Sequence, residues 1–171
     1  MRKAIIFLLL LLLCIPCQAE EAAPLDEKDF VLFLQADVEI HLGQDAEAAA
    51  SLLAAQSGLA FDCLEADSCM FSGKDKEYSN EALVLGSYPI GPQGGDALES
   101  MLIFSPDYQT ARGAKVGFSK AEIETLYGLN YVLDYDQMLY QYGEDGPMLI
   151  FTLNLETDAV VSWMLLRNTV A

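Results

Sequence analysis

The sequence predicts an α+β fold of two related halves, each running strand, helix and antiparallel meander, with helices on one face of an antiparallel sheet. Three observations predict it: short β-prone runs recur along the chain, two capped helical segments interrupt them, and a glycine precedes each helical segment. We expect a signal peptide at 1–19, an acidic tether at 20–29, a first half at 30–108 and a second at 109–171. The halves are expected to form one compact unit, because pairing them buries apolar helix surface.

The first nineteen residues have the pattern of a secretory signal peptide. Arg2 and Lys3 form a basic head, Ala4 to Ile15 an apolar run, and Cys17-Gln18-Ala19 a small-x-small cleavage site. The apolar run is too short for a spanning helix, so we expect no integral membrane span in the mature chain.

The expected location is extracytoplasmic. Attachment to a lipid at the cell surface through Cys14 or Cys17 stays open, since both lie where a lipoprotein cysteine could lie. Leu13 and Pro16, the residues before them, are poor for that processing, which favours a small residue.

The chain is strongly acidic, with 9 Lys and Arg against 26 Asp and Glu and a formal charge of −17. Loss of Arg2 and Lys3 with the signal leaves seven basic residues and a charge of 7 − 26 = −19. Such a surface repels phosphate, which excludes nucleic acid and disfavours an anionic membrane surface. The expected partner is another extracellular or envelope protein, and solubility alone is the simpler explanation of the charge.

Cys63 and Cys69 are the two cysteines that remain after removal of the signal. An even number of cysteines in a secreted domain predicts a structural disulfide between them. Redox catalysis would more naturally show the spacing C-x-x-C, whereas five residues separate Cys63 from Cys69.

The first half begins with two β-prone runs, 30–34 and 38–42, which predict a hairpin. Asp45 can cap a helix over 46–55, and Ala49, Leu52 and Leu53 are expected on one face of it. That helix should end before Ser57-Gly58.

Two more strands are predicted at 81–88 and 97–104, around the turn-rich segment PIGPQGG, after a loop that carries the two cysteines. Alternation places Leu98, Leu102 and Phe104 on one face of the second strand.

The second helix is predicted from Ser119, which with Glu122 forms a capping box, to Gly128, which ends the helix. Its apolar stripe comprises Ile123, Leu126 and Tyr127. A glycine-rich phosphate loop is the functional alternative. It fails because G-x-x-x-x-G-K-S/T is missing and the surrounding charge is negative.

The chain ends in a predicted three-strand meander at 137–142, 148–155 and 159–166. In the middle strand, alternation divides the side chains into an apolar face and a half-polar face. The apolar face comprises Leu149, Phe151, Leu153 and Leu155, and the half-polar face Met148, Ile150, Thr152 and Asn154.

A repeat links the two halves. Alignment of Gly43 with Gly117 also aligns Asp45 with Ser119, at a shift of 117 − 43 = 74 residues. Both copies read strand-like residues, glycine, capped helix, loop and strands. We therefore interpret the repeated motif as structural rather than catalytic.

Three segments resemble a group of small secreted or lipid-anchored bacterial proteins of mostly unassigned function: SCMFSGKDKEYS (68–79), LVLGSYPIG (83–91) and TARGAKVGFSKAEIETLYG (110–128). More distantly, the repeated unit is similar to the β-lactamase-inhibitor-protein-like fold. That resemblance implies non-covalent binding of other proteins through a concave sheet face and its loops. No inhibitor contact residue matches a position in this chain.

Aromatic residues are dense in YVLDYDQMLYQYG, and large amphipathic rings are enriched where proteins hold partners. The expected binding face comprises Tyr131, Tyr135, Tyr140, Tyr142 and Trp163. The alternative is that these rings complete the core of a β-sheet.

Little in the sequence indicates catalysis or a cofactor. The single histidine, His41, has no accompanying nucleophile motif and is expected to be an exposed strand residue. Asp134, Asp136, Glu144 and Asp145 lie close in sequence but fit no EF-hand loop, so at most weak Ca²⁺ binding is expected. The predicted function is therefore a secreted non-catalytic binding protein. The alternative is a small hydrolase that uses Asp134 with Asp136 or Glu144.

Overall fold

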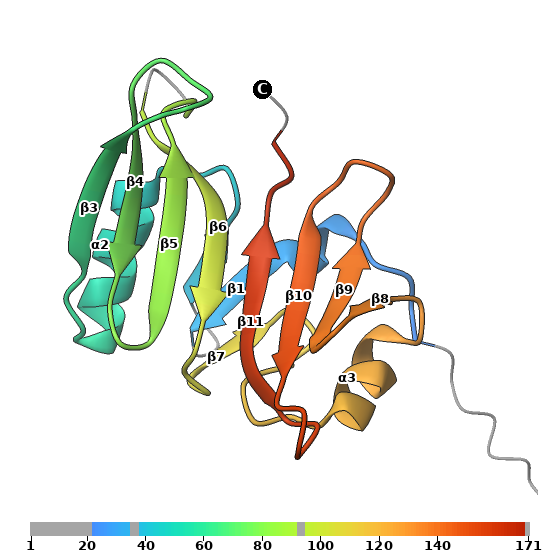
Figure 1. Cartoon of the computed structure of the whole chain (residues 1–171). Helices are drawn as coiled ribbons and strands as arrows, with labels where there is room; N and C mark the ends of the chain where they lie inside the picture. The colour runs from blue at the N-terminus through green and yellow to red at the C-terminus, as the bar shows by residue number, and fades with distance from the viewer. Residues whose placement is uncertain (1–21, 35–37, 92–94, 170–171) are drawn as a thin grey trace, which may run out of the picture.

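The computed structural model describes residues 22–34, 38–91 and 95–169 (Figure 1). The predicted signal peptide, with Cys14 and Cys17, lies outside the described residues. The described elements are, in order, a 3-10 helix η1 (Glu27–Phe30), β1 (Val31–Leu34), β2 (Val38–His41), α2 (Ala46–Ser57), β3 (Asp62–Asp67), β4 (Lys74–Ser79), β5 (Leu83–Tyr88), β6 (Ala97–Ile103), β7 (Tyr108–Thr110), α3 (Lys120–Tyr127), β8 (Val132–Asp134), β9 (Gln137–Gln141), β10 (Met148–Leu153) and β11 (Val160–Leu166).

Eight of the strands form one antiparallel sheet, in the order β3-β4-β5-β6-β11-β10-β9-β8. β6 and β11 pair in its centre, and β3 and β8 are its two edges (Figure 1). A mostly antiparallel sheet with two α-helices belongs to the α+β class, so the predicted class is confirmed.

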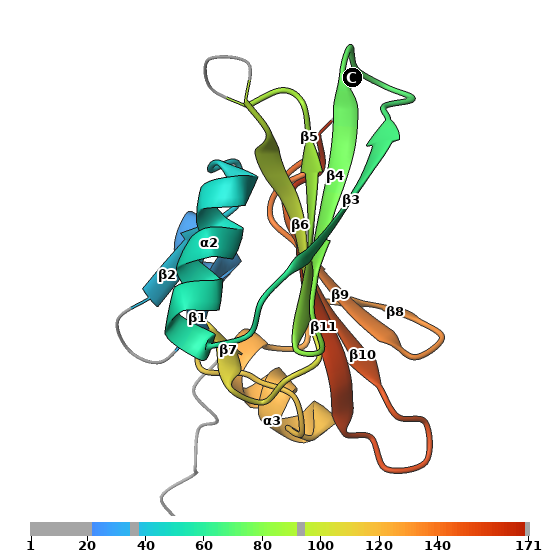
Figure 2. The ribbon, with the colours of Figure 1, turned by 90° about the vertical axis from the view of Figure 1, so that its left-hand side faces the viewer.

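One face of this sheet, the inner face, forms the core. A row of directly paired side chains crosses six strands on this face, and each of them is at most 7% exposed. The row is Tyr78, Leu85, Met101, Leu165, Leu149 and Tyr140. Figure 2 shows α2 and the small sheet on this side, and the ring of Tyr127 on α3 packs 5.5 Å from that of Tyr140.

The remaining three strands form a small sheet in the order β2-β1-β7. The predicted hairpin of β1 and β2 is confirmed, with Val31 opposite His41 and Leu34 opposite Val38. Leu32 and Ile40 of this hairpin are fully buried in the core.

The segment before β1 is held to the rest of the molecule by Arg112. The guanidinium donates Nε and Nη2 to the two carboxylate oxygens of Asp29 at 2.6 Å each, and it also donates to the carbonyls of Ala23 and Pro24. Asp29 is 3% exposed. Residues 22–29 thus lie against the folded domain rather than as a free tether, because the half-buried Arg112 binds the Asp29 carboxylate and two carbonyls of the segment.

Helix α2 begins as predicted at Asp45, whose carboxylate accepts from the Ala48 N–H at 2.7 Å. Its buried face comprises Ala46, Ala49, Ala50 and Leu53. Leu52, which was expected on that face, is 41% exposed. Each residue turns an α-helix by about 100°, so Leu52, next to Leu53, lies at the rim of the buried face.

Helix α3 has the predicted capping box. The Glu122 carboxylate accepts from the Ser119 N–H at 2.7 Å, and the Ser119 hydroxyl accepts from the Glu122 N–H at 3.3 Å. These bonds to its charged form lower the pKa of Glu122. Gly128 ends the helix with a φ of 79°, a conformation that favours glycine.

The segment predicted as a cysteine loop contains two strands, β3 and β4, and the predicted disulfide is wrong. Cys63 and Cys69 are free and exposed. From Cys63 to Asp67 the chain is extended and covers about 13 Å, and the bond from the Ser68 N–H to the Gly73 carbonyl continues the hairpin up to the residue before Cys69. A disulfide requires Cα atoms within about 7 Å. Strand pairing between β3 and β4 thus holds the thiols apart.

A β-bulge changes the predicted faces of β6. The register shifts between Gly86 and Ser87, so that Leu98 and Met101 both point to the inner face. Leu102 lies on the opposite face, and Phe104 is 45% exposed beyond the end of the strand. Leu149, Phe151 and Leu153 are buried in β10 as expected. Leu155 follows the strand and is 58% exposed.

Candidate functional site

The second face of the eight-stranded sheet, the open face, carries no described helix or strand (Figure 2). Directly paired apolar residues form an unbroken row across six strands of this face. The row is Val84, Leu102, Met164, Ile150, Leu139 and Val132. Five strand spacings of about 4.8 Å make this apolar row about 24 Å long.

Exposure along the apolar row increases toward the edge strand β8. Ile150, in the centre, is 6% exposed because neighbouring side chains flank it, whereas Val132 on β8 is 67% exposed. The other members are half-buried. A row of this kind offers apolar contact area that is desolvated at little cost when a partner covers it.

A polar row lies on one side of the apolar row. It consists of Asp134, Gln137, Thr152 and Ser162, which are paired across β8, β9, β10 and β11. On the other side, Leu166 and Met148 extend the apolar area toward the ends of β11 and β10. The open face therefore has an apolar centre with a polar margin, which is the usual composition of a protein-binding surface.

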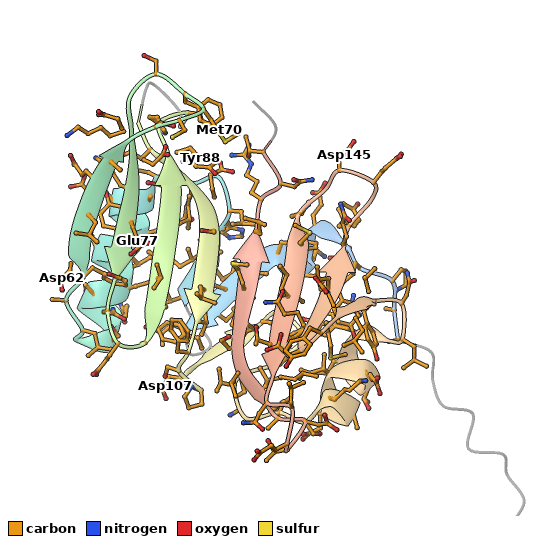
Figure 3. The ribbon with its side chains drawn as sticks, viewed as in Figure 1. Asp62, Met70, Glu77, Tyr88, Asp107 and Asp145 are labelled. Carbon is orange, nitrogen blue, oxygen red and sulfur yellow. The ribbon has the colours of Figure 1, made fainter. Side chains whose placement is uncertain are left out.

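A hollow of about 700 Å³ lies at the β4–β5–β6 end of the open face. Gly86 and Ser100 form part of its floor, and a Cβ at residue 86 would lie 2.5 Å from the Ser100 hydroxyl oxygen. Glu77, on β4, also lines the hollow, and Figure 3 labels this residue. The Asp75 Oδ1 atom is buried there without a hydrogen-bond partner among the described residues. The hollow can accept a side chain of a partner.

The C-terminal segment closes the other side of this hollow. Arg167 donates from Nη1 to Glu99 Oε1 at 3.0 Å, and the Thr169 hydroxyl donates to the second oxygen of the same carboxylate. Glu99 is only 4% exposed, so both of its oxygens are satisfied inside the molecule. These three residues line one side of the hollow. Both oxygens of Glu99 already accept hydrogen bonds within the molecule, so Glu99 is not expected to bind a ligand.

The charge around the eight-stranded sheet is acidic, and it is most one-sided in the second half of the chain. Residues 121–166 contain eight carboxylates and no Lys, Arg or His. In the first half, Lys74 binds Glu65 at 3.0 Å and Lys76 binds Asp96 at 2.7 Å. Each pair favours its charged forms: the hydrogen bond from Lys74 lowers the pKa of Glu65, and the bond to Asp96 raises the pKa of Lys76.

The predicted aromatic binding face is wrong for two of its five residues. Trp163 is fully buried, and Tyr140 is 1% exposed and donates its hydroxyl to the Gly128 carbonyl at 2.9 Å. Both point to the inner face, where Tyr140 packs against the rings of Tyr131 and Phe151. The ring of Tyr127, on α3, packs against those of Tyr140 and Phe151. Tyr140 and Trp163 thus complete the core, which was the alternative interpretation.

The other three rings do not form one surface either. Tyr131 is half-buried and donates its hydroxyl to Glu124 at 2.7 Å. Tyr135 is 80% exposed in the turn before β9, and Tyr142 is 37% exposed beyond the other end of β9, against the ring of Phe30. The length of β9 separates these two tyrosines.

Of the acidic residues proposed for a hydrolase, Glu144 is separated from Asp134 and Asp136. Asp134 ends β8 and Asp136 lies in the β8–β9 turn, whereas Glu144 lies beyond the far end of β9. The five residues of β9 span about 14 Å, more than the roughly 5–9.5 Å between the two carboxyl groups of a glycosidase. No group of three or more His, Cys, Asp or Glu suited to a metal ion occurs among the residues that the structure describes.

His41 is an exposed residue of β2, as expected, and its Nε2 lies 3.5 Å from Glu39. No cysteine or serine accompanies it in a described hydrogen bond. This part of the structure therefore offers no arrangement for nucleophilic catalysis.

Sequence reasoning did not identify the apolar row. Ile150 was assigned to a half-polar face, and Val84, Leu139 and Met164 were not assigned to a site. The available signal was that both alternating faces of β5, β6, β10 and β11 are apolar, which is more than a sheet with one solvated face requires.

None of the helices in the described part of the chain has the length and apolarity needed to cross a membrane. No protein-family model, curated protein or solved structure matches this chain.

Proposed function

We propose that this chain is a secreted, non-catalytic binding protein whose open face contacts another protein. The observation that carries the proposal is the apolar row, which crosses six strands and is covered by no described element. Sheets with one uncovered face normally place polar side chains there. Apolar side chains at the centre of such a face favour a partner that removes them from water.

The partner that fits this face is a basic protein. The formal charge of −17 and the absence of cations from residues 121–166 attract a positive surface and repel an anionic one. The predicted leader at 1–19 places the encounter outside the cytoplasm, with a partner in the envelope or in the surrounding medium.

The proposed fold is a duplicated unit of the β-lactamase-inhibitor-protein-like kind, and equivalent hydrogen bonds support the duplication. The Gly43 N–H donates to the Leu98 carbonyl at 2.7 Å, and the Gly117 N–H donates to the Val160 carbonyl at 2.8 Å. Both glycines have positive φ, 81° and 93°.

The bonds at the two helix starts are equivalent as well. The Ala46 N–H donates to the Asp96 carbonyl at 3.1 Å, and the Lys120 N–H donates to the Asp158 carbonyl at 2.9 Å. Each helix thus begins on the strand that its own half contributes to the centre of the sheet. This arrangement leaves the open face free in both halves.

The test is capture of a partner by the exported chain, which is the protein purified after its secretion from an expression host. Mass spectrometry determines whether its leader has been removed. Proteins from the envelope and medium of the producing organism are passed over it at physiological salt, with another acidic protein as the control surface. We expect one saturable basic partner. The variants Leu139→Asn and Met164→Gln remove apolar contact without a change in charge and should weaken capture about tenfold or more.

The matched control is Leu155→Asn, because Leu155 is 58% exposed but lies in the β10–β11 turn, off the open face. Circular dichroism and thermal unfolding show whether each variant keeps its fold. If Met164→Gln, Leu139→Asn and the unsubstituted chain capture the partner equally, the open face is not the binding surface. If the unsubstituted chain captures no more protein than the acidic control does, the proposed binding function is wrong.

A further inference from the structure

The outer edge of β8 is the most exposed apolar part of the sheet. In the described chain, β8 pairs only with β9 and no strand lies on its other side. Val132 and Leu133 are 67% and 52% exposed, and the flanking Leu129 and Tyr135 are 76% and 80% exposed. An exposed edge with apolar side chains is a template for an additional strand.

The opposite edge of the same sheet is protected. All six residues of β3 are exposed, and three of them are acidic: Asp62, Glu65 and Asp67. Charged side chains along an edge are the usual protection against pairing with another chain. β8 carries one charge, Asp134, at its end next to the turn. The two edges therefore differ in the feature that normally prevents strand addition.

The backbone of β8 presents hydrogen-bonding groups to this free side. Asp134 pairs with Gln137 across a two-residue turn, and such a turn closes on a hydrogen-bonded pair. Hydrogen-bonded and non-hydrogen-bonded pairs alternate along an antiparallel ladder. Leu133 is therefore the residue whose N–H and C=O point away from β9. An added strand would bind these groups.

The side chains of β8 would lie under an added strand on both faces of the sheet. Val132 belongs to the apolar row of the open face, and Leu133 points to the opposite face. A strand placed along β8 would thus continue the apolar row by one more position. It would also cover the exposed side chain of Leu133.

Charge selects the kind of strand that fits. The charges of the β8–β9 hairpin, Asp134 and Asp136, are both acidic, and they lie within residues 121–166, which contain no Lys, Arg or His. A second copy of this chain would bring the same acidic stretch to the edge and be repelled. A segment with Lys or Arg between apolar residues fits better. Its apolar residues can pack on Val132 and Leu133, and its cations are attracted by the acidic surroundings.

We propose that β8 is a strand-addition site, which binds an extended segment of the partner protein in which apolar and basic residues alternate. The proposal rests on the proposed binding function and specifies the element of the partner that is held. The affinity comes from main-chain hydrogen bonds at Leu133 and from burial of the apolar side chains of β8. The selectivity comes from the acidic surroundings.

The test uses a synthetic peptide of alternating lysine and valine and the exported chain labelled with ¹⁵N, at physiological salt. We expect saturable binding, chemical-shift changes along β8 and β9, and at least tenfold slower hydrogen exchange of the Leu133 amide. A peptide of equal charge with proline in place of each valine keeps only the N–H groups of its lysines, and its proline rings fix φ at about −65°, away from β-strand geometry. It should therefore bind at least tenfold more weakly. Binding of the proline peptide with the same affinity would overturn the proposal, because charge alone would then explain it.

Leu133→Pro is the decisive variant, because it removes the outward N–H and leaves the pairs at Val132 and Asp134 in place. It should weaken lysine–valine peptide binding at least tenfold, and Leu133→Asn, which keeps the N–H, should weaken it less. Leu64→Asn on β3 is the matched control, since Leu64 is 65% exposed on the other edge and should have no effect. Undiminished binding by a folded Leu133→Pro variant would overturn the proposal.

Two further outcomes separate this proposal from the function on which it rests. If Met164→Gln abolishes partner capture but the β8 variants leave capture unchanged, the open face binds the partner and strand addition is wrong. Sedimentation of the free chain gives the second outcome. A dimer that Leu133→Pro dissociates would assign the edge to a second copy and overturn a basic partner strand as its occupant.

Discussion

The two faces of the eight-stranded sheet are nearly equal in apolar content but opposite in environment. The row on the inner face and the apolar row on the open face each cross six strands without interruption. The side chains of the inner row are at most 7% exposed, whereas the exposed fraction in the apolar row ranges from 6% at Ile150 to 67% at Val132. Hydrophobicity along a strand therefore does not tell which face is the core. The elements that cover a face decide it.

The inner face is covered by parts of the chain that are distant in sequence. Helices α2 and α3 pack on it, and Phe30, Leu32 and Leu34 of the N-terminal segment join the same core. The open face gains no such cover from the described residues. We therefore expect substitutions on or above the inner face to act on stability, and substitutions on the open face to act on binding.

The largest expected effect is that of Arg112→Ala, which removes the residue that holds the N-terminal segment over the inner face. Asp29 would be left as an unpaired charge at 3% exposure, and breaking a buried ion pair in this way costs about 3–5 kcal/mol. Urea unfolding measures the change. Lys115→Ala, at an exposed position three residues later, is the control and should cost less than about 0.5 kcal/mol. Equal stability of the two variants would show that the segment does not contribute to the cover.

Two neighbouring residues of β11 give the next effect and compare the faces directly. Leu165 is fully buried on the inner face, so Leu165→Ala should cost about 2–5 kcal/mol of unfolding free energy. Met164 is half-buried on the open face, and Met164→Ala should cost about 1 kcal/mol. A larger loss for Met164→Ala in urea unfolding would mean that the open face is covered in solution.

The smallest effect concerns alkaline pH. Burial on the inner face raises the pKa of Tyr78 to about 12, whereas an unfolded tyrosine has a pKa of about 10. Below pH 10 the Tyr78 hydroxyl is protonated in both the folded and the unfolded state, so its titration does not lower the unfolding free energy. The unfolding free energy falls as pH rises from about 10 to 12, because in this range only the unfolded chain releases the proton.

Tyr78→Phe should reduce this loss. The unfolding free energy of the variant should fall less steeply between about pH 10 and 12, while burial of Tyr127 and Tyr140, which also raises their pKa values, retains part of the slope. Denaturant midpoints at half-unit pH steps measure the slopes. Parallel slopes for the two proteins would mean that Tyr78 titrates equally in the folded and unfolded states.

Local chemistry was sufficient to predict much of the fold. Asp45 and Ser119 were identified as helix caps because short polar side chains satisfy backbone donors within the same turn, and both are present. The β1–β2 hairpin and the three strands of the C-terminal meander were likewise predicted from β-prone runs between turn residues. These signals depend on residues within a few positions of one another.

β3, β4 and β8 could not be predicted in the same way. β3 and β4 are polar and exposed, and β8 is three residues long, so each is a strand only because a neighbouring strand satisfies its backbone. The β-bulge at Gly86–Ser87 changed the faces of β6 for a similar reason, since register belongs to a pair of strands.

The sequence by itself determined the helix caps, most strands, the acidic charge and the α+β class, because these follow from local backbone chemistry and composition. Only the tertiary structure decided that Tyr140 and Trp163 are core, that Cys63 and Cys69 lie apart, and that the apolar row is uncovered. The physical reason is that burial depends on what packs above a residue. In this chain the covering elements come from positions far away in the sequence.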